Sequence, residues 1–260
     1  MRVCALQIDV KAAERAANHA TVRRLVAEAV GLCSPEVIVL PELWSTGYVL
    51  EQARELADED RDALFLAELA REYGLAFAGG SVLAAEGGKV FNRAQVVDHE
   101  GHYVASYDKV HLFRLMDEDK YLAPGTSALL FDLGGMPCAS VICYDIRFCE
   151  LSRKLAVQGA EVLFVSAEWP APRVEHWRIL LRARAIENQM YVVACNRCGI
   201  TGNTEFAGRS AIIAPDGTVL AEAGAGEEII WADIEPEAVR RVRSSIPVFA
   251  DSVPELYILK

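Results

Sequence analysis

The sequence has 260 residues, enough for one large domain, and its 52% hydrophobic and 24% charged residues are those of an ordinary globular protein. The formal net charge of −11 argues against broad binding to nucleic acid or to an anionic membrane, because both need clustered lysine and arginine. No apolar stretch approaches the roughly 18–20 residues that cross a bilayer.

Strands and helices alternate in the first part of the chain. Short apolar runs predict the strands Val3–Gln7, Val37–Leu40 and Leu75–Val82. Stretches with helical periodicity predict helices at about Ala12–Cys33 and Asp60–Tyr73. Pro41 ends the second strand, so Glu42 lies just beyond the carboxyl end of a buried strand.

Hairpins and further helix–strand pairs follow in the second part. The expected strands are Val90–Asp98, Tyr103–Tyr107, Leu129–Leu133, Cys138–Cys143, Val162–Ser166, Tyr191–Asn196, Ser210–Ala214, Thr218–Glu222 and Glu228–Asp233. The expected helices are Arg147–Gln158, Val174–Asn188 and Pro236–Arg243. This order predicts an α/β protein with one or two mixed sheets covered by helices, in a single domain of residues 1–260.

The end of the chain, from residue 244, carries two apolar runs, Ile246–Phe249 and Leu256–Leu259. They are too apolar to be left in solvent. We therefore expect residues 244–260 to form an extended arm that packs against this subunit or against a second copy of it.

The seven cysteines lie mostly in apolar, strand-like runs, and their odd number leaves at least one unpaired within the chain. This usage is typical of reduced thiols, and the first residues lack the pattern of a signal peptide, so we expect a cytoplasmic protein. Cys195 and Cys198 have CxxC spacing, but no second pair of ligands accompanies them. We predict neither a metal site nor a cofactor.

Three polar residues share one kind of position. Glu42 follows a strand, Lys109 follows another, and Cys143 ends a third just before a helix. In open α/β sheets, ligands bind in the crevice outside the carboxyl ends of the strands. The three side chains are therefore candidates for one site, although each taken alone is more often a buried thiol, a solvated lysine or a surface turn residue.

The chemistry of these three groups is complementary. The start of a helix and a nearby ammonium group are expected to lower the pKa of the Cys143 thiol. Glu42 can accept the thiol proton and return it to a departing nitrogen. Lys109 and the backbone N–H of Tyr144 can hold the charge of a tetrahedral intermediate. The set suits hydrolysis of an amide through a thioester.

Three segments around these residues resemble the signature blocks of the nitrilase superfamily. They are Pro41-Glu42-Leu43-Trp44, Asp108-Lys109-Val110-His111-Leu112-Phe113 and Cys143-Tyr144-Asp145-Ile146-Arg147-Phe148. Their order and spacing also agree, with 67 residues from Glu42 to Lys109 and 34 from Lys109 to Cys143. Further similar segments, such as Asn92-Arg93-Ala94 and Gly208-Arg209-Ser210, extend the resemblance over nearly the whole chain.

The resemblance implies a four-layer αββα sandwich with two mixed sheets, usually in a homodimer or a larger homo-oligomer. It implies a Glu–Lys–Cys triad at Glu42, Lys109 and Cys143. Many members also carry a second glutamate seven residues before a glycine, in the loop between lysine and cysteine. Glu118 stands seven residues before Gly125 here, and is the candidate for positioning the substrate or supporting Lys109.

The segment Cys143-Tyr144-Asp145 is similar to the ω-amidase branch, whereas members that cleave nitriles typically have Cys-Trp-Glu. The branch implies a small amide substrate, a monoamide of a short dicarboxylate such as 2-oxoglutaramate or succinamate, and water. Arg147 could clamp its carboxylate, or could instead be a structural residue paired with Asp145 or a glutamate. Tyr144 and Trp169 are candidate walls of the pocket.

Two other functions remain open. Hydrolysis of N-carbamoyl amino acids uses the same triad and also needs a carboxylate clamp. A protein of another class, a non-catalytic binding protein on the same fold, would be indicated by loss of a triad residue, and all three are present.

Overall fold

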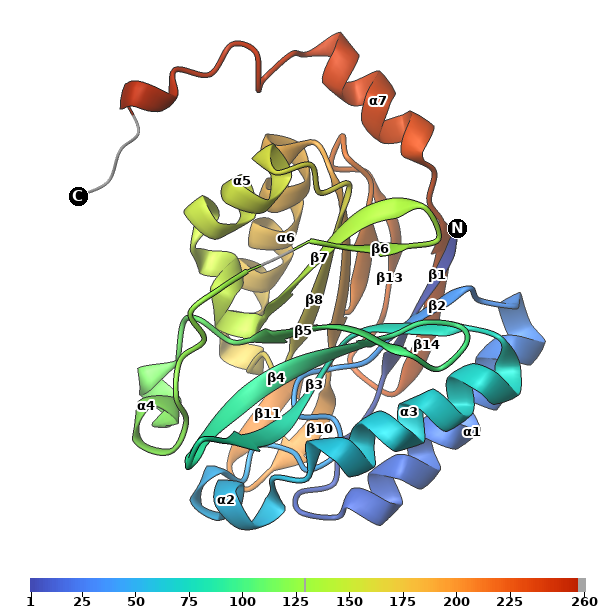
Figure 1. Cartoon of the computed structure of the whole chain (residues 1–260), viewed down its shortest axis with the longest axis vertical. Coiled ribbons are helices and arrows are strands. Elements are labelled where there is room, and N and C mark those ends of the chain that lie inside the picture. The colour runs from blue at the N-terminus through green and yellow to red at the C-terminus, as the bar shows by residue number, and fades with distance from the viewer. Residues whose placement is uncertain (129, 257–260) are drawn as a thin grey trace.

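Two six-stranded sheets stack against each other in the computed structural model, which describes residues 1–128 and 130–256 (Figure 1). Its strands are β1 (Arg2–Gln7), β2 (Val37–Val39), β3 (Ala76–Glu86), β4 (Lys89–Val97), β5 (Tyr103–Asp108), β6 (Phe131–Leu133), β7 (Met136–Ile142), β8 (Val162–Ala167), β9 (Tyr191–Asn196), β10 (Cys198–Thr201), β11 (Thr204–Ala207), β12 (Ala211–Ile213), β13 (Val219–Glu222) and β14 (Glu228–Asp233). Its α-helices are α1 (Arg15–Cys33), α2 (Ala53–Leu56), α3 (Glu59–Tyr73), α4 (Glu118–Tyr121), α5 (Cys149–Val157), α6 (Val174–Asn188) and α7 (Pro236–Ser245).

Both sheets are mixed. The first has the order β14-β1-β2-β3-β4-β5, and its central strands β1, β2 and β3 are parallel. The second has the order β13-β12-β9-β8-β7-β6, with β7, β8 and β9 parallel. Antiparallel strands flank the parallel strands on both sides in each sheet. The fold class predicted from the sequence is confirmed.

Alternating side chains of each central strand serve two different cores, because successive residues of a strand point to opposite faces. Val3 and Ala5 of β1 pack between the sheets, together with Phe164 of β8. Cys4 and Leu6 of the same strand pack under α1 and α3. A third core joins the outer face of the second sheet to α5 and α6, so the layers run helix, sheet, sheet, helix (Figure 1).

The predicted and observed elements agree closely where the apolar pattern is strong. Helix α6 and the strands β9 and β14 have the predicted bounds. The helix expected at roughly Arg147–Gln158 is α5, which begins two residues later, at Cys149, because Cys143–Arg147 forms a 3₁₀ helix. The ribbon of β10 and β11 was not expected, and Leu129, the predicted start of β6, lies outside the described residues.

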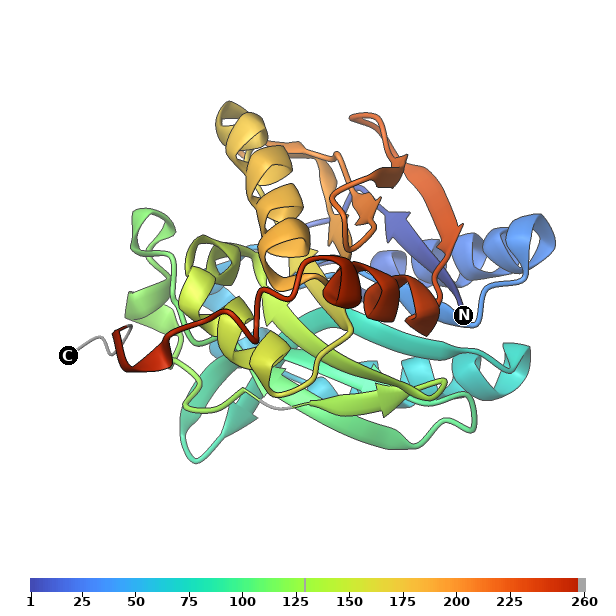
Figure 2. The ribbon, with the colours of Figure 1, turned by 90° about the horizontal axis from the view of Figure 1, so that it is seen from above.

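The segment that follows α7 runs across one end of the molecule, from the side of the N-terminus toward α5 (Figure 2). Gln189 donates a hydrogen bond to the carbonyl oxygen of Ile246 (2.7 Å). Arg153 and Arg243 lie over the ring of Phe249. Residues 257–260 of the expected arm lie outside the described residues. Among those described, none of the helices combines the length and apolar character that spanning a bilayer would need.

Candidate active site

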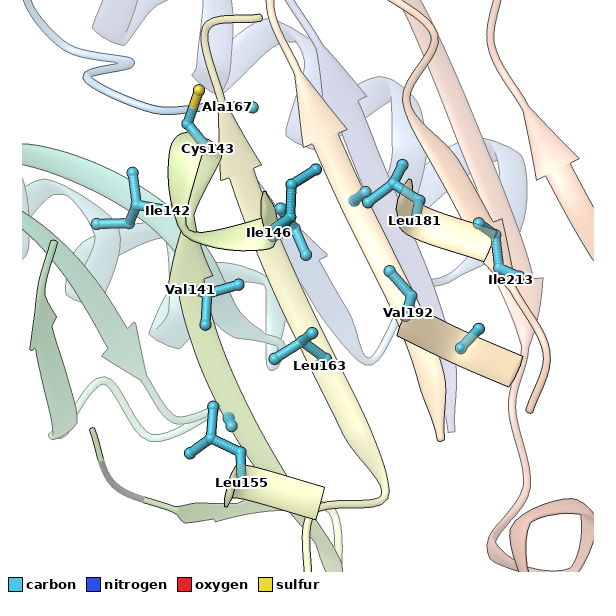
Figure 3. Close-up of a cluster of buried hydrophobic side chains, with 14 of the residues drawn as sticks. Val141, Ile142, Cys143, Ile146, Leu155, Leu163, Ala167, Leu181, Val192 and Ile213 are labelled. Atoms are coloured by element: carbon cyan, nitrogen blue, oxygen red, sulfur yellow. The ribbon is translucent and has the colours of Figure 1, made fainter. Parts of the chain in front are cut away.

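Cys143 stands at the carboxyl end of β7, where the chain turns sharply into the 3₁₀ helix Cys143–Arg147. Its backbone has a φ of 48°, a left-handed conformation that side chains other than glycine adopt at a cost. Figure 3 shows the sulfur pointing away from the apolar cluster that supports the turn through Ile142 and Ile146. Local packing thus holds the thiol at the edge of the sheet.

Lys109 directly follows β5 and lies at the centre of a buried ionic cluster. Its Nζ is 2.7 Å from Oε1 of Glu42 and 2.6 Å from Oε1 of Glu118. All three side chains are at most 1% exposed. Two carboxylates therefore share one ammonium group in a buried setting, where such interactions are stronger than at the surface.

Other hydrogen bonds hold each carboxylate in place. The amide of Asn92 donates to Oε1 of Glu42 (2.8 Å), and the backbone N–H of Glu168 donates to Oε2 (2.8 Å). Tyr48 Oη donates to Oε1 of Glu118 (2.6 Å), and the backbone N–H of Phe113 donates to Oε2 (2.6 Å). Neither carboxylate can turn without losing several bonds.

Gly125 closes the loop that carries Glu118. Its N–H donates to the carbonyl oxygen of Lys109 (2.8 Å). A Cβ at this position would overlap the backbone of Asp108, so only glycine lets the chain pass so close. Gly125 therefore fixes the end of the loop beside Lys109, and the seven-residue spacing brings Glu118 back to the same lysine.

The pKa values of Cys143, Glu42 and Lys109 are shifted by burial and by the charges of their neighbours. Burial and, after it, Glu42 raise the pKa of the Cys143 thiol, although Lys109 opposes them. Burial likewise raises the pKa of Glu42, against Lys109. Burial alone would lower the pKa of Lys109, but Glu118 and Glu42 raise it well above its usual range. The expectation of a lowered thiol pKa is therefore wrong, and Cys143 needs a base beside it.

Asp145 ties the turn after Cys143 to the loop after Lys109. Its oxygens accept hydrogen bonds from Tyr107 Oη (2.7 Å) and from the backbone N–H groups of His111 (3.0 Å) and Ile142 (3.0 Å). The carboxylate is fully buried. With these partners Asp145 does not pair with Arg147, so this part of the structural alternative for Arg147 is wrong.

A narrow pocket opens beside the cluster. The residues that line it include the polar groups above and a ring of aromatic and cationic side chains: Tyr48, Lys109, Phe113, Met116, Glu118, Cys143, Tyr144, Arg147, Glu168, Trp169, Pro170 and Arg173.

Arg147 and Arg173 lie at the rim of this pocket. The guanidinium of Arg147 lies over the ring of Trp169 (4.7 Å) and contacts His176, and that of Arg173 lies over Phe113 (5.8 Å). Within residues 1–128 and 130–256, no carboxylate forms a salt bridge with either arginine. Burial lowers the pKa of Arg147, and the neighbouring Arg173 lowers it further, whereas Tyr144 opposes the shift.

The residues expected from the sequence thus lie around one pocket: Glu118, Lys109, Cys143, Tyr144, Arg147 and Trp169 line it, and Glu42 bonds Lys109 behind it. Sequence reasoning missed Tyr48, Glu168 and Arg173. Glu168 directly follows β8, just as Glu42 follows β2, so the rule that selected Glu42 could have found it. Tyr48 lies in a loop and Arg173 ends a short 3₁₀ helix, Ala171–Arg173, and neither carries a comparable signal.

Comparisons with known proteins agree with this geometry. The family model of carbon-nitrogen hydrolases matches residues 2–244. A 2-oxoglutaramate amidase of Bacillus subtilis is 50% identical over 224 residues, which cover 85% of this chain and 86% of that protein. The ω-amidase YafV of Escherichia coli K12 is 36% identical over 235 residues, 90% of each chain. The structure also superposes on a CN-hydrolase superfamily protein from Xanthomonas campestris, with a TM-score of 0.91 and 29% identity over 97% of each chain. That protein was solved with an arsenic adduct in its active site.

Proposed function

This chain belongs to the carbon-nitrogen hydrolase family, and we propose that it is an ω-amidase that hydrolyses the terminal amide of a short dicarboxylate monoamide and releases ammonia. Substrates of this class are 2-oxoglutaramate and succinamate. The similarity to a 2-oxoglutaramate amidase and to an ω-amidase supports this class of substrate.

The observation that carries the substrate class is the pair of rim arginines without a salt-bridge partner among the described residues. Arg147 and Arg173 line the same pocket as Cys143. A guanidinium group can bind a carboxylate through two parallel hydrogen bonds. A monoamide of a dicarboxylate has a carboxylate at one end and the scissile amide at the other, so it can occupy the rim and the inner end together.

The reaction begins with proton transfer from the Cys143 thiol to Glu42, whose raised pKa suits a base for a thiol. The sulfur attacks the amide carbon, and the resulting oxyanion is held by Lys109 and by the backbone N–H of Tyr144. Glu42 then gives the proton to the amide nitrogen, the C–N bond breaks, and ammonia leaves a thioester on Cys143. Water attacks this thioester, with its proton taken by Glu42 and returned to the sulfur, and the dicarboxylate is released.

Glu118 acts through Lys109 in this scheme. Its 2.6 Å contact to Nζ keeps the ammonium charged and aimed at the position of the oxyanion. It is itself fixed by Tyr48 and by the backbone of Phe113. Glu118 is therefore a positioning residue, while Glu42, Lys109 and Cys143 contact the reacting atoms.

The test is ammonia release from 2-oxoglutaramate, succinamate, glutamine, an N-carbamoyl amino acid and a simple nitrile, with wild type beside Cys143→Ala. We expect turnover of the two dicarboxylate monoamides, and a loss of at least about 10⁴-fold in Cys143→Ala, because the nucleophile is removed. Preference for the carbamoyl substrate would replace the ω-amidase by an N-carbamoyl amino acid amidohydrolase. Turnover of none would favour a non-catalytic binding role.

We also propose that the protein works in the cytoplasm as a homodimer. All seven cysteines are free, and six are buried, which suits a reducing compartment. On α6, Ile179 and Ile186 are 62% and 49% exposed, an apolar surface that a second copy could cover. Light scattering that gives the mass of a monomer would contradict the dimer.

A further inference from the structure

Glu168 is a buried carboxyl group of the pocket that the scheme above does not use. It directly follows β8, is 1% exposed, and lines the pocket together with Cys143. Figure 3 shows Ala167, the residue before it, beside Cys143 at the ends of the neighbouring strands β8 and β7. Glu168 is thus positioned by the same two strands that position the nucleophile.

The two oxygens of this carboxyl group have different surroundings. Oε2 lies 3.4 Å from a guanidinium nitrogen of Arg197. Oε1 is fully buried and has no hydrogen-bond partner among the described residues. A buried polar atom without a partner is rare, because leaving water without a replacement costs free energy. Since Glu168 lines the pocket, a ligand there is the partner that Oε1 can find.

The cations around Glu168 are already engaged. Arg197 is divided between Glu168, Asp9 (3.4 Å) and the carbonyl oxygen of Val10 (2.7 Å). Lys109 is held by two other carboxylates. A negative charge on Glu168 would therefore lie close to that of Glu42 without a cation of its own.

Electrostatics agrees with this geometry. Burial raises the pKa of Glu168 to about 8, with Arg197 opposing the rise and Glu42 adding to it. The other ionisable groups that line the pocket are Tyr48, Lys109, Glu118, Cys143, Tyr144, Arg147 and Arg173, and of these Lys109 also opposes the rise. The carboxyl group is thus mostly neutral at neutral pH and becomes charged as the pH rises past about 8.

We propose that Glu168 is a specificity-determining residue that, as a neutral carboxyl group, donates a hydrogen bond from Oε1 to an oxygen atom of the anionic substrate. Arg197 donates to Oε2, so the proton resides on Oε1, the oxygen without a partner among the described residues. When Glu168 loses this proton, the hydrogen bond becomes a repulsion between two negative charges. This inference rests on the proposed function, because it assumes a substrate that carries a carboxylate.

The test measures the affinity of the full chain for succinamate by calorimetry, from about pH 6 to about pH 9.5. The Cys143→Ala variant is used, so that nothing is turned over and no thiol titrates. We expect a dissociation constant that is constant up to about pH 7 and rises roughly tenfold for each pH unit above about 8. In Cys143→Ala/Glu168→Gln we expect a flat profile, because Arg197 fixes the glutamine carbonyl and its NH₂ group donates to the ligand at every pH.

A second variant, Asp9→Asn, acts from outside the pocket. It removes the carboxylate of Asp9, with which Glu168 shares the guanidinium group of Arg197. Arg197 then stabilises the charged form of Glu168 more strongly, and the pKa of Glu168 falls. The rise of the dissociation constant in Cys143→Ala/Asp9→Asn is therefore expected at lower pH, a result that does not need Glu168→Gln to fold. An unchanged profile in this variant, or the same rise in the glutamine variant, would overturn the proposal.

Ammonia release by the wild type separates the two claims. If it releases ammonia from no dicarboxylate monoamide, the proposed function fails and this inference fails with it. If turnover is normal but the dissociation constant does not depend on pH, only the role of Glu168 is overturned.

Discussion

The inner end of the pocket and its rim hold charged side chains in opposite situations. At the inner end, Lys109 is fully buried between Glu42 and Glu118, and each carboxylate has further hydrogen-bond donors. At the rim, Arg147 and Arg173 lie over aromatic rings, and neither forms a salt bridge within the described residues.

The difference separates what the protein supplies from what the substrate must bring. Charges that are satisfied inside the chain keep a fixed geometry, which is what stabilising a transition state requires. Charges left without a counter-ion favour a ligand of opposite sign. Substitutions at the inner end should therefore affect both stability and turnover, whereas those at the rim should affect affinity and leave the fold intact.

The largest effect is expected for Lys109→Met. Two buried carboxylates would lose the cation that they share, and breaking a buried ion pair typically costs about 3–5 kcal/mol of unfolding free energy. Turnover should be lost as well. Lys120→Met is the matched control, because Lys120 forms an exposed pair with Asp117 on the same loop, and such pairs contribute about 0–1 kcal/mol. Equal stability of the two variants in urea denaturation would break the comparison.

An intermediate effect is expected for Arg147→Gln. Loss of a charged hydrogen bond to the substrate carboxylate, of about 1.5–3 kcal/mol, corresponds to a roughly 10- to 100-fold fall in kcat/KM for succinamate. The fall should lie mainly in KM, and a neutral amide such as propionamide should be unaffected. Arg178→Gln, which removes an exposed arginine paired with Glu222, should leave both substrates unchanged. An equal loss on both substrates would show that Arg147 is structural.

The smallest effect is expected for Tyr48→Phe. It removes one hydrogen bond to Glu118, which still bonds Lys109 and the backbone of Phe113. We expect a loss of about 1–3 kcal/mol in unfolding free energy and a several-fold fall in kcat, with KM unchanged. Tyr121→Phe, at a 39% exposed tyrosine of the same loop, is the control. A change in KM alone would place Tyr48 in substrate binding.

Much of the fold could be predicted because its signals are local. The apolar runs of β8 and β9 are buried on both faces, and their continuous hydrophobicity marks them as central strands. The ribbon of β10 and β11 was missed although Gly202-Asn203, between its two strands, is a known hairpin signal. Its strands are short, and Ile200 is exposed, so the apolar pattern is weak.

Most residues of the candidate site could be predicted from the sequence, but their pKa shifts and ionic partners could not. The position of Cys143 after a strand is visible in the sequence, whereas the sign of its pKa shift depends on how burial, Glu42 and Lys109 balance in space. In the same way, the partner of Arg147 could not be chosen from the sequence. Asp145 is near it along the chain, but bonds Tyr107 and His111, which belong to another strand end.

The pairing of β1 with β14 has a consequence for how this chain is made. Arg2 and Asp233 bond each other across 231 residues, and β14 is the edge strand that pairs with β1 in the sheet as described. At about 5–20 residues per second, the ribosome takes roughly ten to fifty seconds to deliver β14 after β1 has emerged. Throughout that time one edge of an apolar strand is open to other chains, so assembly of the first sheet is slow and exposed to aggregation by its topology.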